Sequence, residues 1–189
     1  NYDTNKSSNF LVNKFNWNFK DKRFSNGIKG RFLTNFKNIN YESKNIGNLK
    51  QDTTSELYGA FGYFSEIDLQ KEENGFLYSL KPKFLLRFSP GSMRKETEGS
   101  RLDPSAAFSM DRLDRDNNFE TGLSSTLGFD YNIKGKNKEL DFSVAQILNQ
   151  KENDKMPSKT SLDEKTSDLV GSSNLKLNDN VRFKYSFSL

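Results

Sequence analysis

Residues 180–189 read NVRFKYSFSL and indicate the fold class of the chain. Their apolar side chains occupy alternate positions, namely Val181, Phe183, Tyr185, Phe187 and Leu189. The positions between them are polar or basic and include Arg182 and Lys184. Because successive side chains of a β-strand point to opposite faces, this segment has one apolar face and one polar, basic face.

The same alternation recurs along nearly the whole chain, and no stretch with a helical period competes with it. Only 33% of the residues are hydrophobic, yet 13% are aromatic. Alternating strands explain both values, because half of each strand is polar and the connections are charged. We therefore predict an all-β fold of about eight antiparallel strands. The predicted strands cover residues 10–20, 27–38, 54–68, 75–88, 121–133, 139–148, 166–177 and 180–189.

The connections between these strands alternate in length. The short ones are 20–26, 70–75, 134–138 and 178–180, and the long ones are 39–53, 89–120 and 150–165. Outer-membrane barrels have short turns on the periplasmic side and longer loops outside. The pattern thus predicts a transmembrane up-and-down β-barrel with 89–120 as a long extracellular loop. The apolar piece of this loop, SAAFSM at 105–110, is shorter than the roughly 9–11 residues of a spanning strand.

The order of connections places both Asn1 and Leu189 on the loop side, whereas a complete bacterial barrel begins and ends in the periplasm. We therefore expect residues 1–189 to be a partial outer-membrane β-barrel domain, an internal slice of a larger barrel, with no periplasmic domain in this chain. Pro82 lies in mid-strand and cannot donate a ladder hydrogen bond, so it should mark a local weak point or a bulge.

If the aromatic faces meet lipid, the polar faces line the lumen and are basic. Seven candidate lumen-facing bases follow from the alternation: Lys29, Arg31, Lys81, Lys83, Arg87, Arg182 and Lys184. Such a surface attracts anionic solutes. The alternative is the ordinary charged interior of a water-filled barrel. Residues on this polar face, such as Ser79 and Ser124, should tolerate a charge.

Catalysis finds no support in the sequence. The chain has no cysteine and no histidine, which removes the thiolate and the commonest general base. The acidic pair Asp111 and Asp114 lies among arginines and is interpreted as solvated charge. We expect no enzyme activity, catalytic residue, cofactor or metal site. The net charge of +4 is too small to indicate a nucleic-acid partner.

Two stretches contain short motifs in a defined order and spacing. The first, within 107–131, carries Phe108, Ser109, Arg112, Glu120 and Gly122. The second, within 161–189, carries Leu162, Asp163, Glu164, Ser167, Asp168, Leu169, Val170, Gly171, Asn178, Asp179, Tyr185 and Phe187. Together these motifs resemble the LptD family of lipopolysaccharide-assembly outer-membrane proteins.

The resemblance implies a translocon barrel that delivers lipopolysaccharide to the outer leaflet of the outer membrane of a Gram-negative bacterium. The candidate lumen bases would then act together on the phosphates of this lipid. It also implies an LptE-type plug lipoprotein inside the barrel, contact with outer-membrane lipid, and an LptA-type periplasmic bridge through an N-terminal domain absent from this chain. Two alternatives remain open from the residues: another porin or channel for anionic solutes, and a soluble β-sandwich binding module.

Overall fold

The computed structural model describes residues 5–47, 49–113 and 115–189 and is built almost entirely of β-strands. Two 3₁₀ helices, Ala106–Phe108 and Ser158–Thr160, are the helical elements of the described residues. The strands are β1 (Ser7–Asn18), β2 (Lys22–Arg23), β3 (Ile28–Lys44), β4 (Asp52–Ile67), β5 (Leu69–Glu73), β6 (Phe76–Ser89), β7 (Gly122–Lys134), β8 (Glu139–Asn149), β9 (Val170–Lys176) and β10 (Arg182–Ser188).

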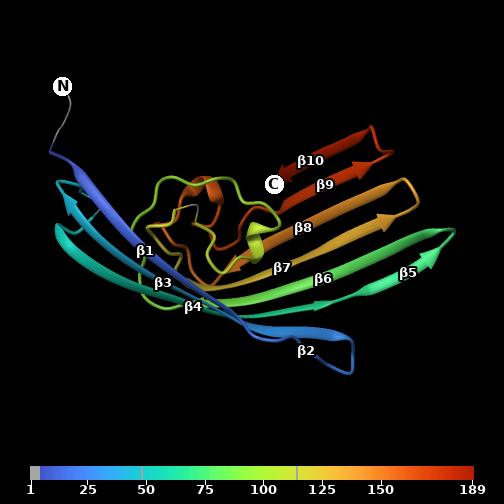
Figure 1. Ribbon diagram of the computed structural model, residues 1–189, viewed down its shortest axis with the longest axis horizontal. Helices are drawn as coiled ribbons and strands as arrows, with labels where there is room; N and C mark the ends of the chain where they lie inside the picture. The colour runs from blue at the N-terminus through green and yellow to red at the C-terminus, as the bar shows by residue number, and fades with distance from the viewer. Residues whose placement is uncertain (1–4, 48, 114) are drawn as a thin grey trace.

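All ten strands form one antiparallel sheet, in the order β1-β3-β4-β6-β7-β8-β9-β10 (Figure 1). The short strand β2 pairs with β3, and β5 pairs with β6, so the sheet has eight rows. These rows confirm the eight predicted strands and the all-β, up-and-down fold class. Within the described residues β1 and β10 lie at opposite ends of the order and do not pair, so the sheet is open.

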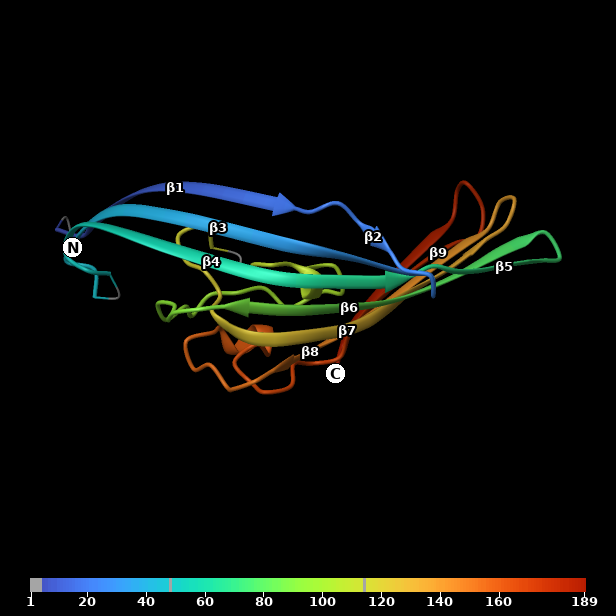
Figure 2. The ribbon, with the colours of Figure 1, turned by 90° about the horizontal axis from the view of Figure 1, so that it is seen from below.

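Several predicted boundaries were wrong. The strands β3 and β4 extend further than expected, which reduces the connection 39–53 to residues 45–51. The predicted turn at 70–75 contains β5, and the turn itself is Asn74-Gly75. Both residues have positive φ, 52° and 77°, which Asn and Gly adopt readily in tight hairpins. The alternation of short and longer connections persists. In Figure 2 the short turns gather at one end of the sheet, at the right.

The end of the chain agrees with this arrangement where the structure describes it. Leu189 exchanges backbone hydrogen bonds of 2.9 and 3.1 Å with Leu169, at the loop end of β9. Asn1 lies outside the described residues. No helix among the described residues has the length and apolar character needed to cross a bilayer.

Pro82 interrupts the ladder between neighbouring strands, as predicted. Pairing of β4 with β6 stops at Glu66–Lys83 and resumes between β5 and β6 at Leu69–Leu80. Register is the same on both sides of this gap, so no residue is inserted. The missing amide hydrogen of proline accounts for the gap.

The convex face of the sheet is apolar and exposed. Its side chains come from the alternate positions predicted to face lipid, and several are half or more exposed: Leu11, Phe15, Trp17, Phe32, Leu57, Leu127, Phe183 and Tyr185. Neighbouring rings contact one another, as in the edge-to-face pair Phe36–Phe61 with centroids 5.6 Å apart. An exposed apolar face of this extent matches the outward band of membrane barrels and differs from a soluble surface.

The concave face is covered by two long connections, residues 90–121 and 150–169, which we call the cap (Figure 1). Both apolar cores of the described structure lie between the cap and the strands. The larger comprises Met93, Leu102, Ala107, Ala145, Ile147, Met156, Leu162 and Val170. The smaller comprises Leu33, Phe64 and Leu85, with Phe108 and Met110 of the cap packed on it. The described part of 90–121 contains no strand, so it is not a spanning hairpin.

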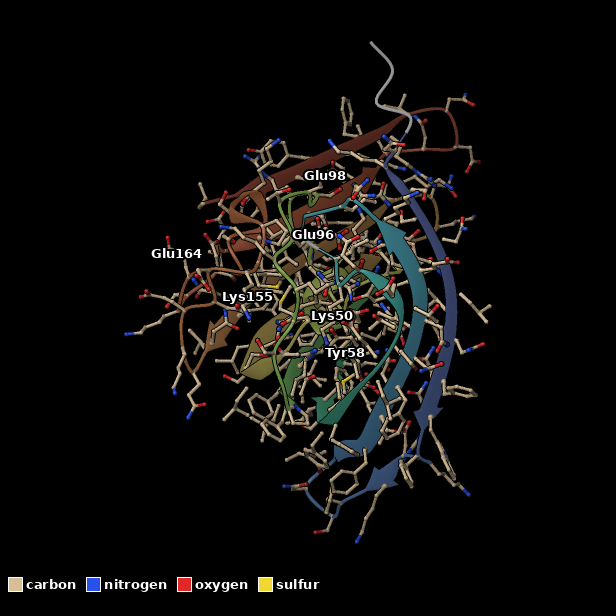
Figure 3. The ribbon with its side chains drawn as sticks, turned by 90° about the vertical axis from the view of Figure 1, so that its left-hand side faces the viewer. Lys50, Tyr58, Glu96, Glu98, Lys155 and Glu164 are labelled. Atoms are coloured by element: carbon tan, nitrogen blue, oxygen red, sulfur yellow. The ribbon has the colours of Figure 1, made fainter. Side chains whose placement is uncertain are left out.

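The two cap segments lie side by side when the molecule is viewed from the loop end (Figure 3). The backbone amide of Glu96 donates a hydrogen bond of 2.9 Å to the carbonyl of Lys155. The ammonium group of Lys155 in turn donates to the hydroxyl of Ser92 at 2.5 Å. Close packing of the cap also needs Gly62 on β4, because a Cβ there would lie 2.7 Å from the sulfur of Met110. The cap is therefore part of the folded core.

Candidate functional site

A buried ion pair closes the segment of the cap that leads into β7. The guanidinium of Arg112 donates from Nε to Oε2 of Glu120 at 2.7 Å, and its Nη2 donates to Oε1 of the same carboxylate. Nη2 also donates to the hydroxyl of Ser124 on β7 at 2.9 Å. The Arg112 side chain is 0% exposed and that of Glu120 is 5% exposed. Two parallel N–H···O contacts of this kind fix orientation as well as distance.

Two strand residues extend this ion pair across the concave face. Arg87 on β6 donates to the carbonyl oxygens of Met110 at 2.7 Å and Glu120 at 2.5 Å. Lys37 on β3 donates to Asp111 Oδ2 at 2.5 Å and to the carbonyl of Asn118 at 2.8 Å. We call Lys37, Arg87, Asp111, Arg112 and Glu120 the anchor cluster.

An aromatic ring of the cap completes the packing of this cluster. The buried ring of Phe119 lies 5.3 Å from the Lys37 ammonium and 5.9 Å from the Arg87 guanidinium. It stacks on Tyr58 of β4, with centroids 5.9 Å apart. The cap is therefore fastened to β3, β4, β6 and β7 by side chains that are largely withdrawn from water.

The two carboxylates of the anchor cluster titrate in opposite directions. Burial by itself would raise the pKa of Glu120, but the positive charges of Arg112 and Arg87 outweigh it and hold that pKa below its ordinary value. For Asp111 burial prevails over the nearby Lys37 and raises its pKa. Asp111 is thus buried and paired, and its interpretation as solvated charge was wrong. Asp114, the other member of that acidic pair, lies outside the described residues.

One expectation for the polar face also changes. Ser124 is 4% exposed and accepts the hydrogen bond from Arg112, so an arginine there would add a third guanidinium to a closed cluster. Ser79 lies near the turn end of β6, away from this cluster, and remains suitable as a tolerant position.

The second family-like stretch also consists of residues with structural roles. Leu162 belongs to the larger apolar core. The hydroxyl of Ser188 donates to Asp168 Oδ2 at 2.5 Å, and Asn178 Oδ1 accepts two backbone hydrogen bonds in the β9–β10 turn. Gly171 lies under the ring of Phe187, where a Cβ would come within 2.1 Å of the ring. These residues fasten the last hairpin to the cap and shape its turn.

The seven candidate lumen bases all belong to the concave side of their strands, but their electrostatic surroundings differ. Lys29 and Lys81 both pair with Asp68 at the Pro82 gap. Three others pair with acids: Arg31 with Asp21 at 3.2 Å, Lys83 with Asp130 at 2.8 Å, and Arg87 with Glu120 at 3.5 Å. Within the described residues Arg182 and Lys184 form no ion pair and are exposed. Phosphate binding by the whole set stays a prediction.

The acids that pair with these bases were hard to foresee from the sequence. Asp68, Asp130 and Glu120 are brought into place by strand register and by the cap rather than by nearness along the chain. A usable signal for the cap did exist. Apolar residues such as Leu85 and Ile147 interrupt the alternation on the polar face, near the loop ends of β6 and β8. They mark where the concave face is covered. In the described structure no three His, Cys, Asp or Glu side chains are grouped to hold a metal ion.

Comparison with protein families identifies the part of the chain that builds this arrangement. Residues 105–189 match the model described as LptD: LPS transport system D. The match covers 85 of the 189 residues and supports an LptD-family fragment in this part of the chain. The matched region includes the anchor residues Arg112 and Glu120 together with Gly171, which confirms the resemblance. A comparison with curated proteins gave no match.

Membership in the LptD family supports involvement in lipopolysaccharide transport. The family consists of outer-membrane β-barrel proteins of Gram-negative bacteria and is a transport family rather than an enzyme family. The exposed convex face and the single antiparallel sheet agree with a barrel wall.

Proposed function

We propose that this chain forms wall and cap of an outer-membrane translocon that delivers lipopolysaccharide to the outer leaflet. The observation that carries the proposal is the LptD match over 105–189, because this segment supplies Arg112 and Glu120, which fasten the cap to the sheet. The convex face would then meet membrane lipid, and the concave face would line the lumen. Within this proposal, 90–121 is extracellular.

The physical separation of the two faces supports this function. Lipopolysaccharide joins acyl chains to a large polar saccharide that carries phosphates. An apolar convex surface suits the acyl environment, whereas the concave surface offers hydroxyl, amide and charged groups. Arg182 and Lys184 are the candidate bases best placed to contact phosphate, because each of the other five already forms an ion pair with an acid.

The anchored cap gives the proposed lumen a closed outer end. A transported molecule passing along the concave face would meet the cap near β6–β8. An LptE-type plug lipoprotein would occupy the remaining lumen, and an LptA-type bridge would deliver the lipid from the periplasm through another domain. These two partners are proposals from the family assignment.

Conditional depletion of the full-length protein in living cells tests the function. We expect newly made, isotopically labelled lipopolysaccharide to stop reaching the cell surface while its synthesis continues. Re-expression of the full-length protein should restore its arrival. Unchanged lipopolysaccharide at the surface, together with slower uptake of small anionic solutes, would contradict the proposal and favour a porin-like channel.

A further inference from the structure

An open cavity of about 830 Å³ lies between the cap and the second half of the sheet. Its cap wall is formed by residues 101–105, and its sheet wall includes Lys83, Asp130, Ser143, Ser172 and Ser186. We call it the serine cavity. Its volume falls within the roughly 300–1,000 Å³ typical of small-ligand sites.

Three serines form a row along the floor of the serine cavity. Register pairs Ser143 of β8 with Ser172 of β9, and Ser172 with Ser186 of β10. Ser143 donates a hydrogen bond of 2.8 Å to Asp130. The hydroxyls of Ser172 and Ser186 have no side-chain partner among the described residues, so both a donor and an acceptor remain free at each.

A second polar row lies beside the serines. Asp141 accepts from Asn132 at 2.5 Å and from Asn174 at 3.0 Å, and Lys184 pairs in register with Asn174. The Oδ1 atom of Asn174 is buried and has no hydrogen-bond partner. This row borders a smaller adjoining pocket, which Ser143, Ser172 and Ser186 also line.

The charges around the serine cavity cancel. Lys83 is neutralised by Asp130, and the free Arg101 lies two residues from Asp103. Asp103 stays ionised, because hydrogen bonds from Ala106 and Ser105 outweigh the effect of burial and lower its pKa. Two bases and two acids leave no net charge to attract an anion. Free hydroxyls and balanced charges suit a neutral, polyhydroxylated ligand.

We propose that the serine cavity binds neutral sugar residues of the transported glycolipid, and that its phosphates are held elsewhere. This inference rests on the proposed function. It adds a binding position and a ligand chemistry that membership in the family does not supply. Each sugar would exchange hydrogen bonds with Ser172, Ser186 and Arg101 in place of water.

Site-specific photo-crosslinking in the full-length protein tests this inference. A benzophenone amino acid replaces Ser105 in the cap wall of the cavity, which leaves the serines of the floor intact, and in a separate variant Ser173 as the matched control. Ser173 follows Ser172 on the same strand and faces the convex side. The cells make either complete lipopolysaccharide or a truncated form that keeps the phosphorylated lipid part and lacks the neutral sugars.

We expect position 105 to crosslink to complete lipopolysaccharide at least about tenfold more than to the truncated form, since that ratio corresponds to one or two lost hydrogen bonds. Position 173 should show no such difference. Equal crosslinking to both glycolipids, crosslinking to a protein alone, or none in correctly folded variants would overturn the inference. The depletion experiment tests the transport function separately. If depletion stops lipopolysaccharide from reaching the surface but the crosslink fails, only the assignment of the serine cavity is wrong.

Discussion

Replacing Glu120 with glutamine should detach the cap from the sheet. The Glu120 carboxylate accepts two hydrogen bonds from Arg112 and lies 3.5 Å from Nη1 of Arg87, and both arginine side chains are at most 1% exposed. Glu120→Gln keeps the shape but leaves two buried guanidiniums without their shared counter-charge. Removing one partner of a buried pair costs about 3–5 kcal/mol, so local opening should become roughly 10²–10⁴-fold more populated.

Hydrogen–deuterium exchange of the full-length protein in lipid vesicles measures this opening. Peptides covering 105–121 should exchange faster in Glu120→Gln, whereas peptides from β9 and β10 should change little. Glu98→Gln is the matched control, because Glu98 and its partner Arg115 are 71% and 45% exposed. An exposed pair of this kind contributes about 0–1 kcal/mol. Equal exchange in the two variants, or faster exchange throughout the sheet, would refute the reasoning.

The remaining predictions concern pH, the two faces and the last hairpin. Because the pKa of Glu120 is held below its ordinary 4.5, its stabilisation is present above that pH and is lost as the pH falls through the lower folded-state value. The ratio of pepsin cleavage of 105–121 in Glu120→Gln to that in the unchanged protein, measured at the same pH, should therefore fall towards one as the solution is acidified. Phe84→Arg should reduce assembly of the folded barrel, because a charge near the lipid midplane costs about 2–4 kcal/mol. Heat-modifiable gel migration measures this assembly, and the control variant Ser79→Arg should assemble normally. Gly171→Ala should lower the denaturation midpoint because a Cβ there lies 2.1 Å from the Phe187 ring, and the double variant with Phe187→Ala should lose less than the sum of the two single variants. Neutralising both Arg182 and Lys184 should slow delivery of lipopolysaccharide to the surface at matched levels of folded protein, whereas neutralising the paired Arg31 should not.

The strands could be predicted because their period-two pattern is local. Each of the eight rows follows from alternation within a dozen residues, as in β10. Boundaries near turns were less accurate, because β5 continues through charged residues that pair in the ladder as readily as apolar ones. The interruption at Pro82 was predictable, since it depends on one missing amide hydrogen.

The anchor cluster could be predicted only in part. The sequence motif contained Arg112 and Glu120, but their pairing depends on the path of the cap, which a short motif does not define. Lys37 lies 74 residues from Asp111 along the chain, so their ion pair could not be predicted from the sequence. The same reason explains why the concave bases looked unpaired. Their acids come from other strands and from the cap.

Cysteine labelling along β10 tests the central claim most directly, namely that the convex face meets lipid and the concave face meets water. Each residue from Arg182 to Ser188 is replaced singly by cysteine in the full-length protein, with every other cysteine changed to serine. In outer membranes, a water-soluble maleimide should label positions 182, 184, 186 and 188, while 183, 185 and 187 should react only with a membrane-soluble maleimide. Labelling of positions 183, 185 and 187 by the water-soluble maleimide in place of the even-numbered positions would contradict the account. Equal labelling at all seven positions would contradict it too.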